Sequence, residues 1–184
     1  SFILIVLPTA LFPLVLNSFS RPPISIDWGP YAGAALLMLL TSALFCAVGI
    51  LFSSLTRSQT ASGLATFAAC CIIFFAGHIE RIGADMLLGG PALTLVPSHY
   101  ALAFAGGLID TRPMVACITG AVLALVVATH ILQWSRFRSA RLLPGMLLAV
   151  ALMAVMVLMI NHLGKRHYML SDWTGTGRHT LASQ

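Results

Sequence analysis

The chain has 184 residues, of which 59% are hydrophobic and 8% charged, with a formal net charge of +5. Soluble domains carry about 25% charged residues, so this composition excludes an ordinary water-soluble protein. The basic residues lie singly or in one short cluster between apolar runs, which excludes the basic stripe that would follow a nucleic-acid backbone. We therefore expect an integral membrane protein whose main partner is the lipid bilayer, with no nucleic acid.

Five stretches are long and apolar enough to cross the hydrocarbon core, which needs about 20 mostly apolar residues. Each has too little alternation for a strand, and hydrocarbon tolerates only helices or closed barrels, since every backbone amide needs a partner. The sequence predicts an all-α fold, a polytopic transmembrane helical bundle of about five membrane helices. In chain order these are residues 2–19, 31–55, 60–77, 113–133 and 143–163.

The first of these stretches begins directly after Ser1, with neither an initiating Met nor a basic flank. This start is a poor match to a cleavable signal peptide. We expect the sequence to begin part-way through a helix of a longer protein.

A short polar loop joins the second and third predicted helices. Ser and Thr hydroxyls can end one helix and cap the next, and a basic residue can hold the turn at the headgroups. An ordinary polar hairpin is the alternative interpretation. The loop consists of Ser53, Ser54, Leu55, Thr56, Arg57, Ser58 and Gln59.

The segment 77–112 is too polar for a simple span and too apolar for a solvated loop, and Gly and Pro residues interrupt it. It predicts short interfacial or re-entrant helices between the third and fourth spans. Charges held at an apolar interface need partners, so they are candidates for an outer gate or pathway mouth. Pairing with one another and with headgroups is the alternative. The five candidates are Glu80, Arg81, Asp85, Asp110 and Arg112.

Basic residues in the short loops set the expected orientation, because Lys and Arg favour the cytoplasmic side. Three arginines between residues 136 and 141 place the connection of the fourth and fifth helices inside, and alternation places Arg57 inside. The segment 77–112 and the tail 161–184 then lie outside. Two basic residues at the outer end of the last helix oppose this rule: Lys165 and Arg166.

Chemistry within the chain is not indicated. The sequence has no recognisable nucleophile–base arrangement and no P-loop, so we expect no enzyme, no cofactor and no metal site. The four cysteines lie in apolar runs without CxxC spacing, which favours packing. Methionines of the last helix are also read as packing rather than a copper site. His130, inside the fourth helix, is a candidate functional group, with a hydrogen bond to a neighbouring helix as the alternative.

Several patterns occur together in an order and spacing that resemble a known family. In the first part of the chain these patterns are Asp27-Trp28-Gly29-Pro30, Gly49 with the 53–59 loop, and His99, Phe104 and Gly107-Leu108-Ile109-Asp110-Thr111-Arg112. In the tail they are Asn161, His167-Tyr168, Asp172-Trp173-Thr174 and residues 178–183. Over residues 16–138 the chain thereby resembles the ABC type-2 (ABC-2) transporter permeases of the gliding-motility type. The tail resembles the start of the extracytoplasmic auxiliary protein that accompanies such permeases.

The resemblance implies two regions. Residues 1–138 would be the C-terminal part of the permease, with four transmembrane helices, and residues 139–184 a linker, a fifth transmembrane helix and the truncated start of an extracytoplasmic domain. It also implies a multi-pass subunit of the bacterial cytoplasmic (inner) membrane, with an extracytoplasmic tail. Such permeases work as dimers and export a substrate, here unidentified, with a separate cytoplasmic ABC ATPase.

Two other classes of function are open at this stage. A non-transporting scaffold could present an extracytoplasmic domain through the last helix. An intramembrane enzyme would need a polar constellation within the spans, which the sequence does not offer.

Overall fold

The computed structural model describes residues 27–79, 97–137 and 143–174, together with positions 11, 15, 18 and 19. The predicted helix at residues 2–19 therefore lies largely outside the described residues, as do Glu80, Arg81 and Asp85. The helices are α2 (Trp28–Leu55), α3 (Gln59–Ile79), α5 (Pro97–Ala105), α6 (Thr111–Phe137) and α7 (Leu143–Arg166), and the strands are β1 (Leu108–Asp110) and β2 (Leu170–Asp172).

Three of these helices, α2, α6 and α7, are long and apolar enough to cross a membrane. Their most apolar windows have mean hydropathies of 2.5, 2.3 and 2.4. The apolar stretch in α3, Gln59–Phe75, is shorter. The structure is thus helical and consistent with a membrane protein, whereas the predicted count of five spans is not confirmed.

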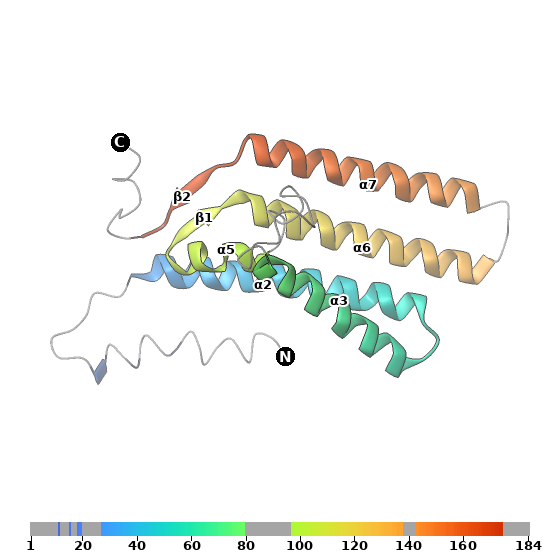
Figure 1. Cartoon of the computed structure of the whole chain (residues 1–184), viewed down its shortest axis with the longest axis horizontal. Helices are drawn as coiled ribbons and strands as arrows, with labels where there is room; N and C mark the ends of the chain where they lie inside the picture. Colours follow the sequence, from blue (N-terminus) through green and yellow to red (C-terminus); the bar gives the residue numbers. More distant parts are fainter. Residues whose placement is uncertain are drawn as a thin grey trace.

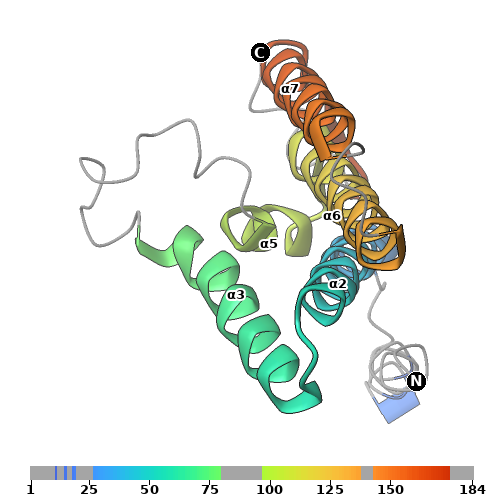
Figure 2. The same ribbon diagram turned by 90° about the vertical axis from the view of Figure 1, so that its right-hand side faces the viewer.

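The three long helices lie side by side along the long axis of the molecule (Figure 1). α2 and α6 run in one direction and α7 in the other, and α6 packs against both of its neighbours. α3 turns back after α2 and diverges from the bundle (Figure 2). We call the end that carries the α2–α3 loop the loop end, and the opposite end, with α5, β1 and β2, the cap end. The loop bearing Arg57, the end of α6 and the start of α7 share the loop end, as alternation predicts.

Small side chains let α2 and α6 approach closely. Ala47 in α2 and Ala128 in α6 are buried, and a Cβ at Gly120 would lie 3.1 Å from Leu44 Cδ1. Close approach of this kind holds membrane helices together by van der Waals contact, since lipid tails are as apolar as the side chains. Small residues of α2 and α6 therefore serve packing between these helices.

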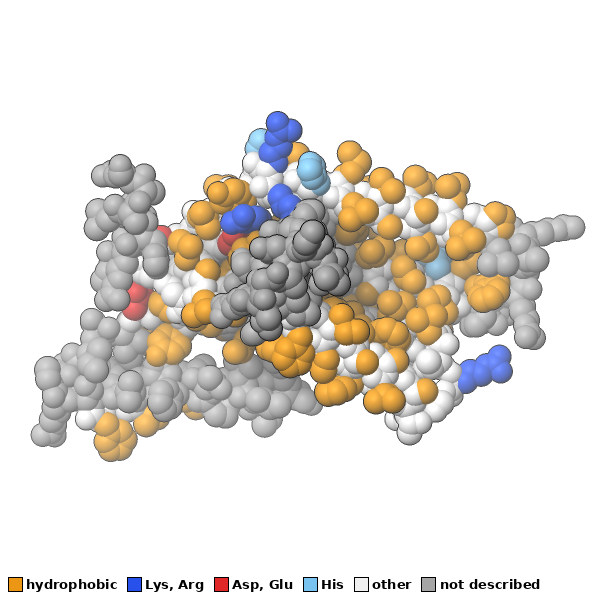
Figure 3. Space-filling view, in the orientation of Figure 1, with side chains coloured by type: hydrophobic (Ala, Val, Ile, Leu, Met, Phe, Trp, Pro, Cys, Tyr) orange, Lys and Arg blue, Asp and Glu red, His pale blue; other side chains and the backbone are white. Residues whose placement is uncertain are grey.

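Large apolar side chains cover much of the described part of the face shown in Figure 3. Leu64 and Ile72 of α3 and Met159 of α7 are each about two-thirds exposed or more. A soluble protein rarely exposes apolar patches of this extent, because they drive association in water. A bilayer would cover this surface with acyl chains.

The polar ends of α6 match the thickness of a bilayer. Arg112 at the cap end and the half-exposed Trp134 towards the loop end are 22 residues apart, or about 33 Å at 1.5 Å per residue. The hydrocarbon core is about 30 Å thick, and Trp and Arg side chains favour its two boundaries. This spacing is consistent with a membrane boundary at the cap end.

The all-α prediction missed a small antiparallel ribbon. β1 pairs with β2 in the register Leu108↔Asp172, Ile109↔Ser171 and Asp110↔Leu170. Three-residue strands are too short to show a period-2 pattern, which needs at least four residues. The prediction of short helices in the segment 77–112 is confirmed for α5, and residues 80–96 lie outside the described residues.

Candidate functional site

A glycine turn directs the chain from α5 into β1. The Gly107 N–H donates to the Phe104 carbonyl at 3.0 Å, and Gly107 has φ of 83°, the left-handed conformation that commonly ends helices. A Cβ at this position would lie 2.7 Å from Thr174 Cγ2 and 3.3 Å from the Pro30 ring. Gly107 thus allows the start of α2, the turn and the tail to meet.

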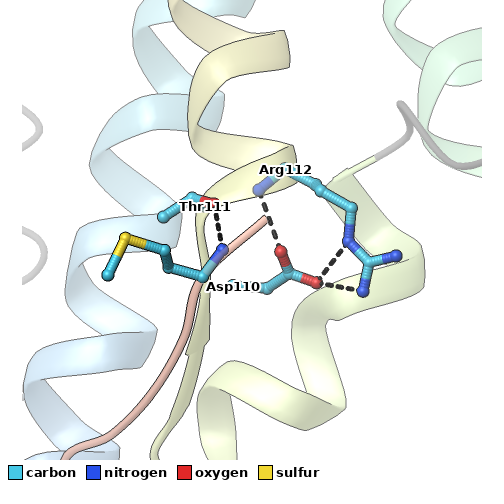
Figure 4. A network of polar contacts seen from close by, with 4 residues as sticks. Asp110, Thr111 and Arg112 are labelled. Carbon is cyan, nitrogen blue, oxygen red and sulfur yellow. Dashed lines mark hydrogen bonds and ion pairs between the residues drawn. The ribbon is translucent and has the colours of Figure 1, made fainter. Parts of the chain in front are cut away.

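Asp110 ends β1 and directly precedes α6, and the residue is almost fully buried, at 2% exposure. One carboxylate oxygen accepts the Arg112 backbone N–H at 2.9 Å, which is N-terminal capping of α6. The other accepts from Arg112 Nε at 2.8 Å and Nη2 at 2.7 Å (Figure 4). A buried carboxylate is costly unless charge-assisted hydrogen bonds satisfy it, and this forked arrangement does so.

The Arg112 guanidinium also contacts two aromatic rings. Its Cζ lies 4.0 Å from the ring centroid of Tyr168, in the connection from α7 to β2, and 5.7 Å from that of Tyr100, in α5. Cation–π contacts contribute about 0.5–1 kcal/mol at exposed sites and more where water is excluded. One arginine side chain therefore joins α5, β1, the start of α6 and the tail.

Backbone hydrogen bonds attach the tail on either side of the ribbon. Thr111 N–H donates to the Met169 carbonyl at 3.3 Å. Met169 N–H donates to Thr111 Oγ1 at 3.2 Å, the bond drawn at Thr111 in Figure 4. Trp173 N–H donates to the Gly107 carbonyl at 3.0 Å. The tail is thus held over the whole length of β1.

The tail also contacts the beginning of α2. The Asp27 side chain caps this helix by accepting from Gly29 N–H at 3.2 Å, and a Cβ at Gly29 would overlap the Trp173 carbonyl oxygen. Beyond this contact, Asp172 accepts from the N–H and hydroxyl of Thr174 at 2.9 and 2.6 Å, which closes a local turn. Gly29 is therefore needed for the tail to reach α2.

These contacts define one unit, which we call the cap: residues 27–31, 100–112 and 168–174. It brings together patterns that sequence analysis assigned to separate regions. Among the predicted gate residues, Asp110 and Arg112 pair with one another, as the alternative interpretation expected, and a gate role for them stays a prediction. Sequence analysis did not single out Tyr100, and it gave Tyr168 only as part of a family pattern, without a contact to Arg112. Aromatic residues near a cation at a predicted membrane boundary would have been the signal.

The 53–59 loop lies at the other end of α2. Ser54 Oγ donates to the Leu51 carbonyl at 2.7 Å, and Thr56 Oγ1 and N–H donate to the Phe52 carbonyl at 2.9 and 3.2 Å. These hydroxyls end α2, as predicted, and α3 starts at Gln59. The loop and the cap lie at opposite ends of α2, whose 28 residues span about 42 Å, so the two candidate regions are separate.

Asn161 and His130 are polar residues of the long helices. The Asn161 side-chain amide of α7 donates to Thr119 Oγ1 of α6 and to the Val157 carbonyl, both at 2.9 Å. This is an interhelical polar contact that sequence analysis missed. His130 Nδ1 is buried and has no hydrogen-bond partner within the described residues, so the expected interhelical hydrogen bond does not form at this nitrogen.

The described residues contain no group of three or more His, Cys, Asp or Glu side chains that could hold a metal ion. In the cap, hydrogen bonds and the stacking of Arg112 on Tyr168 fix the tail to the starts of α2 and α6.

Comparisons with known proteins give no further guide: no family model matches the chain, and neither a similar curated protein nor a similar solved structure is found. The function is therefore argued from the residues and their geometry.

Proposed function

We propose that this chain is part of the membrane subunit of an ATP-driven exporter, an ABC type-2 permease joined to the start of an extracytoplasmic domain. A separate cytoplasmic ATPase would drive it, and a second copy would complete the dimer. The proposal rests on one observation: the patterns at residues 27–30, 107–112 and 172–174 meet in the cap. Patterns that are scattered in sequence but form one unit support the resemblance better than the patterns alone.

The two ends of the bundle would then have different roles. The loop end, with Arg57 and the arginines that follow α6, would face the cytoplasm and the ATPase. The cap end would face outward and continue into the extracytoplasmic domain. The charge rule for short loops supports this direction.

The cap would form the outer gate of the pathway. Asp110 and Arg112 are two residues apart, so opening of the helices cannot separate them from one another. Contacts that can open are those between the bundle and the tail: the β1–β2 pairing and the stacking of Arg112 on Tyr168. Arg112 would thus hold the segment that follows α7 against the bundle in the closed state and release it on opening.

Co-purification tests this proposal. The full-length protein would be tagged, extracted in mild detergent and examined for a stoichiometric ATP-binding subunit whose ATPase activity depends on the membrane partner. Retention of that subunit is the expected result. Its absence, under conditions that preserve a known ABC complex, would refute the exporter assignment.

A scaffold that presents an outer domain is the second candidate, and one observation favours it. The tail is fixed to the bundle by backbone hydrogen bonds at both Met169 and Trp173, which suits a permanent support as well as a gate. Co-purification distinguishes the two, since a scaffold requires no ATPase.

A further inference from the structure

An apolar groove of about 460 Å³ runs along α7 towards the cap end. Among the described residues its lining comes from α7 alone. By helical spacing this face is distinct from the one that holds Asn161 against Thr119. The lining residues are Val155, Leu158, Met159, Ile160, His162 and Leu163.

The side chains along this groove change from apolar to basic towards the cap end. Val155, Met159, His162 and Arg166 are spaced i, i+4, i+7 and i+11, so they follow one face of the helix. The first two are apolar and about half to two-thirds exposed. His162 follows, and Arg166 lies one turn further, beside Lys165 in the last turn of α7. Lys, Arg and His side chains gather over this end of α7 (Figure 3).

The length of the groove matches one leaflet of a bilayer. From Val155 to Arg166 the helix rises about 16 Å, and half of the hydrocarbon core is about 15 Å. Arg166 lies at the cap end, where Arg112 and Tyr168 mark the membrane boundary. An acyl chain in the groove would therefore bring its headgroup to the level of the two cations.

We propose that this face of α7 binds an anionic phospholipid. One acyl chain lies along Val155 and Met159, and the phosphate accepts hydrogen bonds from Arg166 and Lys165. Charge complementarity selects an anionic lipid, because a zwitterionic headgroup brings an ammonium group that the two cations repel. The proposal also gives a role to Lys165 and Arg166, whose position opposes the charge rule used to orient the chain. It does not depend on transport.

Lipid-dependent stability tests the site. Full-length protein in neutral detergent would be titrated with phosphatidylglycerol, phosphatidylcholine or inorganic phosphate, with the midpoint of thermal unfolding and native mass spectrometry as readouts. We expect phosphatidylglycerol to bind and raise the midpoint, and the other two to have little effect. Each cation contributes about fivefold, so the double variant K165Q/R166Q should weaken phosphatidylglycerol binding roughly 25-fold.

Two further variants keep the test decisive. Arg57→Gln removes a cation at the loop end and should leave phosphatidylglycerol binding at this face of α7 unchanged. Val155→Phe places a ring in the groove at an exposed position, and should weaken phosphatidylglycerol binding without altering the charges. Val155→Phe also tests the site if the K165Q/R166Q protein does not fold.

Four results would overturn the proposal. These are equal binding of phosphatidylglycerol and phosphatidylcholine, full competition by inorganic phosphate, and an unchanged affinity in K165Q/R166Q. The fourth is a disulfide between copies of Met159→Cys in membranes, which would show that a second copy covers this face.

Discussion

Replacing Arg112 with Gln leaves the Asp110 carboxylate, 2% exposed, without the guanidinium that donates to it. Removing one partner of a buried ion pair costs about 3–5 kcal/mol. The Arg112 side chain is 27% exposed, so water would screen part of this loss. Loss of the stacking on Tyr168 adds about 0.5–1 kcal/mol. We expect a net destabilisation of about 3 kcal/mol, confined to the cap.

Two measurements report this loss. The midpoint of thermal unfolding in detergent should fall by several degrees. Limited digestion with trypsin should cut faster after Lys165 and Arg166, because Tyr168 no longer holds the chain that follows α7. Arg57→Gln is the matched control, since it removes an exposed arginine at the loop end.

A double-mutant cycle separates the ion pair from general damage. Asp110→Asn keeps an N-cap acceptor of similar quality and removes the charge that Arg112 neutralises. If the pairing is as described, D110N should rescue part of the R112Q defect, with a coupling energy of about 1–3 kcal/mol. Additive effects of the two substitutions, or an R112Q protein as stable and as protease-resistant as R57Q, would refute the reasoning.

Three further predictions follow from the same contacts. Gly107→Ala should lower the thermal midpoint by the equivalent of about 1–2 kcal/mol or more, because φ of 83° disfavours Ala and its Cβ meets Thr174; an unchanged midpoint would contradict the turn. Asn161→Ala should destabilise the protein by about 0.6 kcal/mol, the typical value of an interhelical hydrogen bond in a membrane. Thr119→Val removes the same hydrogen bond, so the double variant should be no less stable than Asn161→Ala alone. L108C/D172C should form a disulfide without reductant, whereas L108C paired with Ser171→Cys, one residue out of register, should form it poorly.

The long helices were predictable because each contains a run of about 20 or more mostly apolar residues, and all residues of the run indicate the same helix. α2 begins at Trp28 rather than residue 31 because Asp27 caps it. α7 continues past the predicted end at residue 163 to Arg166, because charged residues at a membrane boundary can still be part of a helix. Hydropathy shows where an apolar run lies, but it does not show which capping residue or charge sets the exact end of a helix.

The cap could be predicted only in part. Asp110 and Arg112 stood out as charges in an apolar segment, and each is the other's partner. Their environment depends on β2, which is 60 residues away and returns to β1 because α7 is antiparallel to α6. Pairing over that distance depends on the packing of whole helices. No local pattern in a three-residue strand specifies it.

The L108C/D172C disulfide also separates the two proposed functions. β1 leads directly into α6, and the segment after β2 contacts Gly29 at the start of α2. A covalent bond across the ribbon would therefore hold the cap closed while the loop end stays free to rearrange. In an exporter whose outer gate must open, oxidation should abolish transport-coupled ATPase activity, and reduction should restore it. In a scaffold the same bond would strengthen a permanent junction, so presentation of the outer domain would be unaffected. If a stoichiometric ATPase is retained and its activity is the same in both redox states, the exporter proposal survives, but the cap is not its gate.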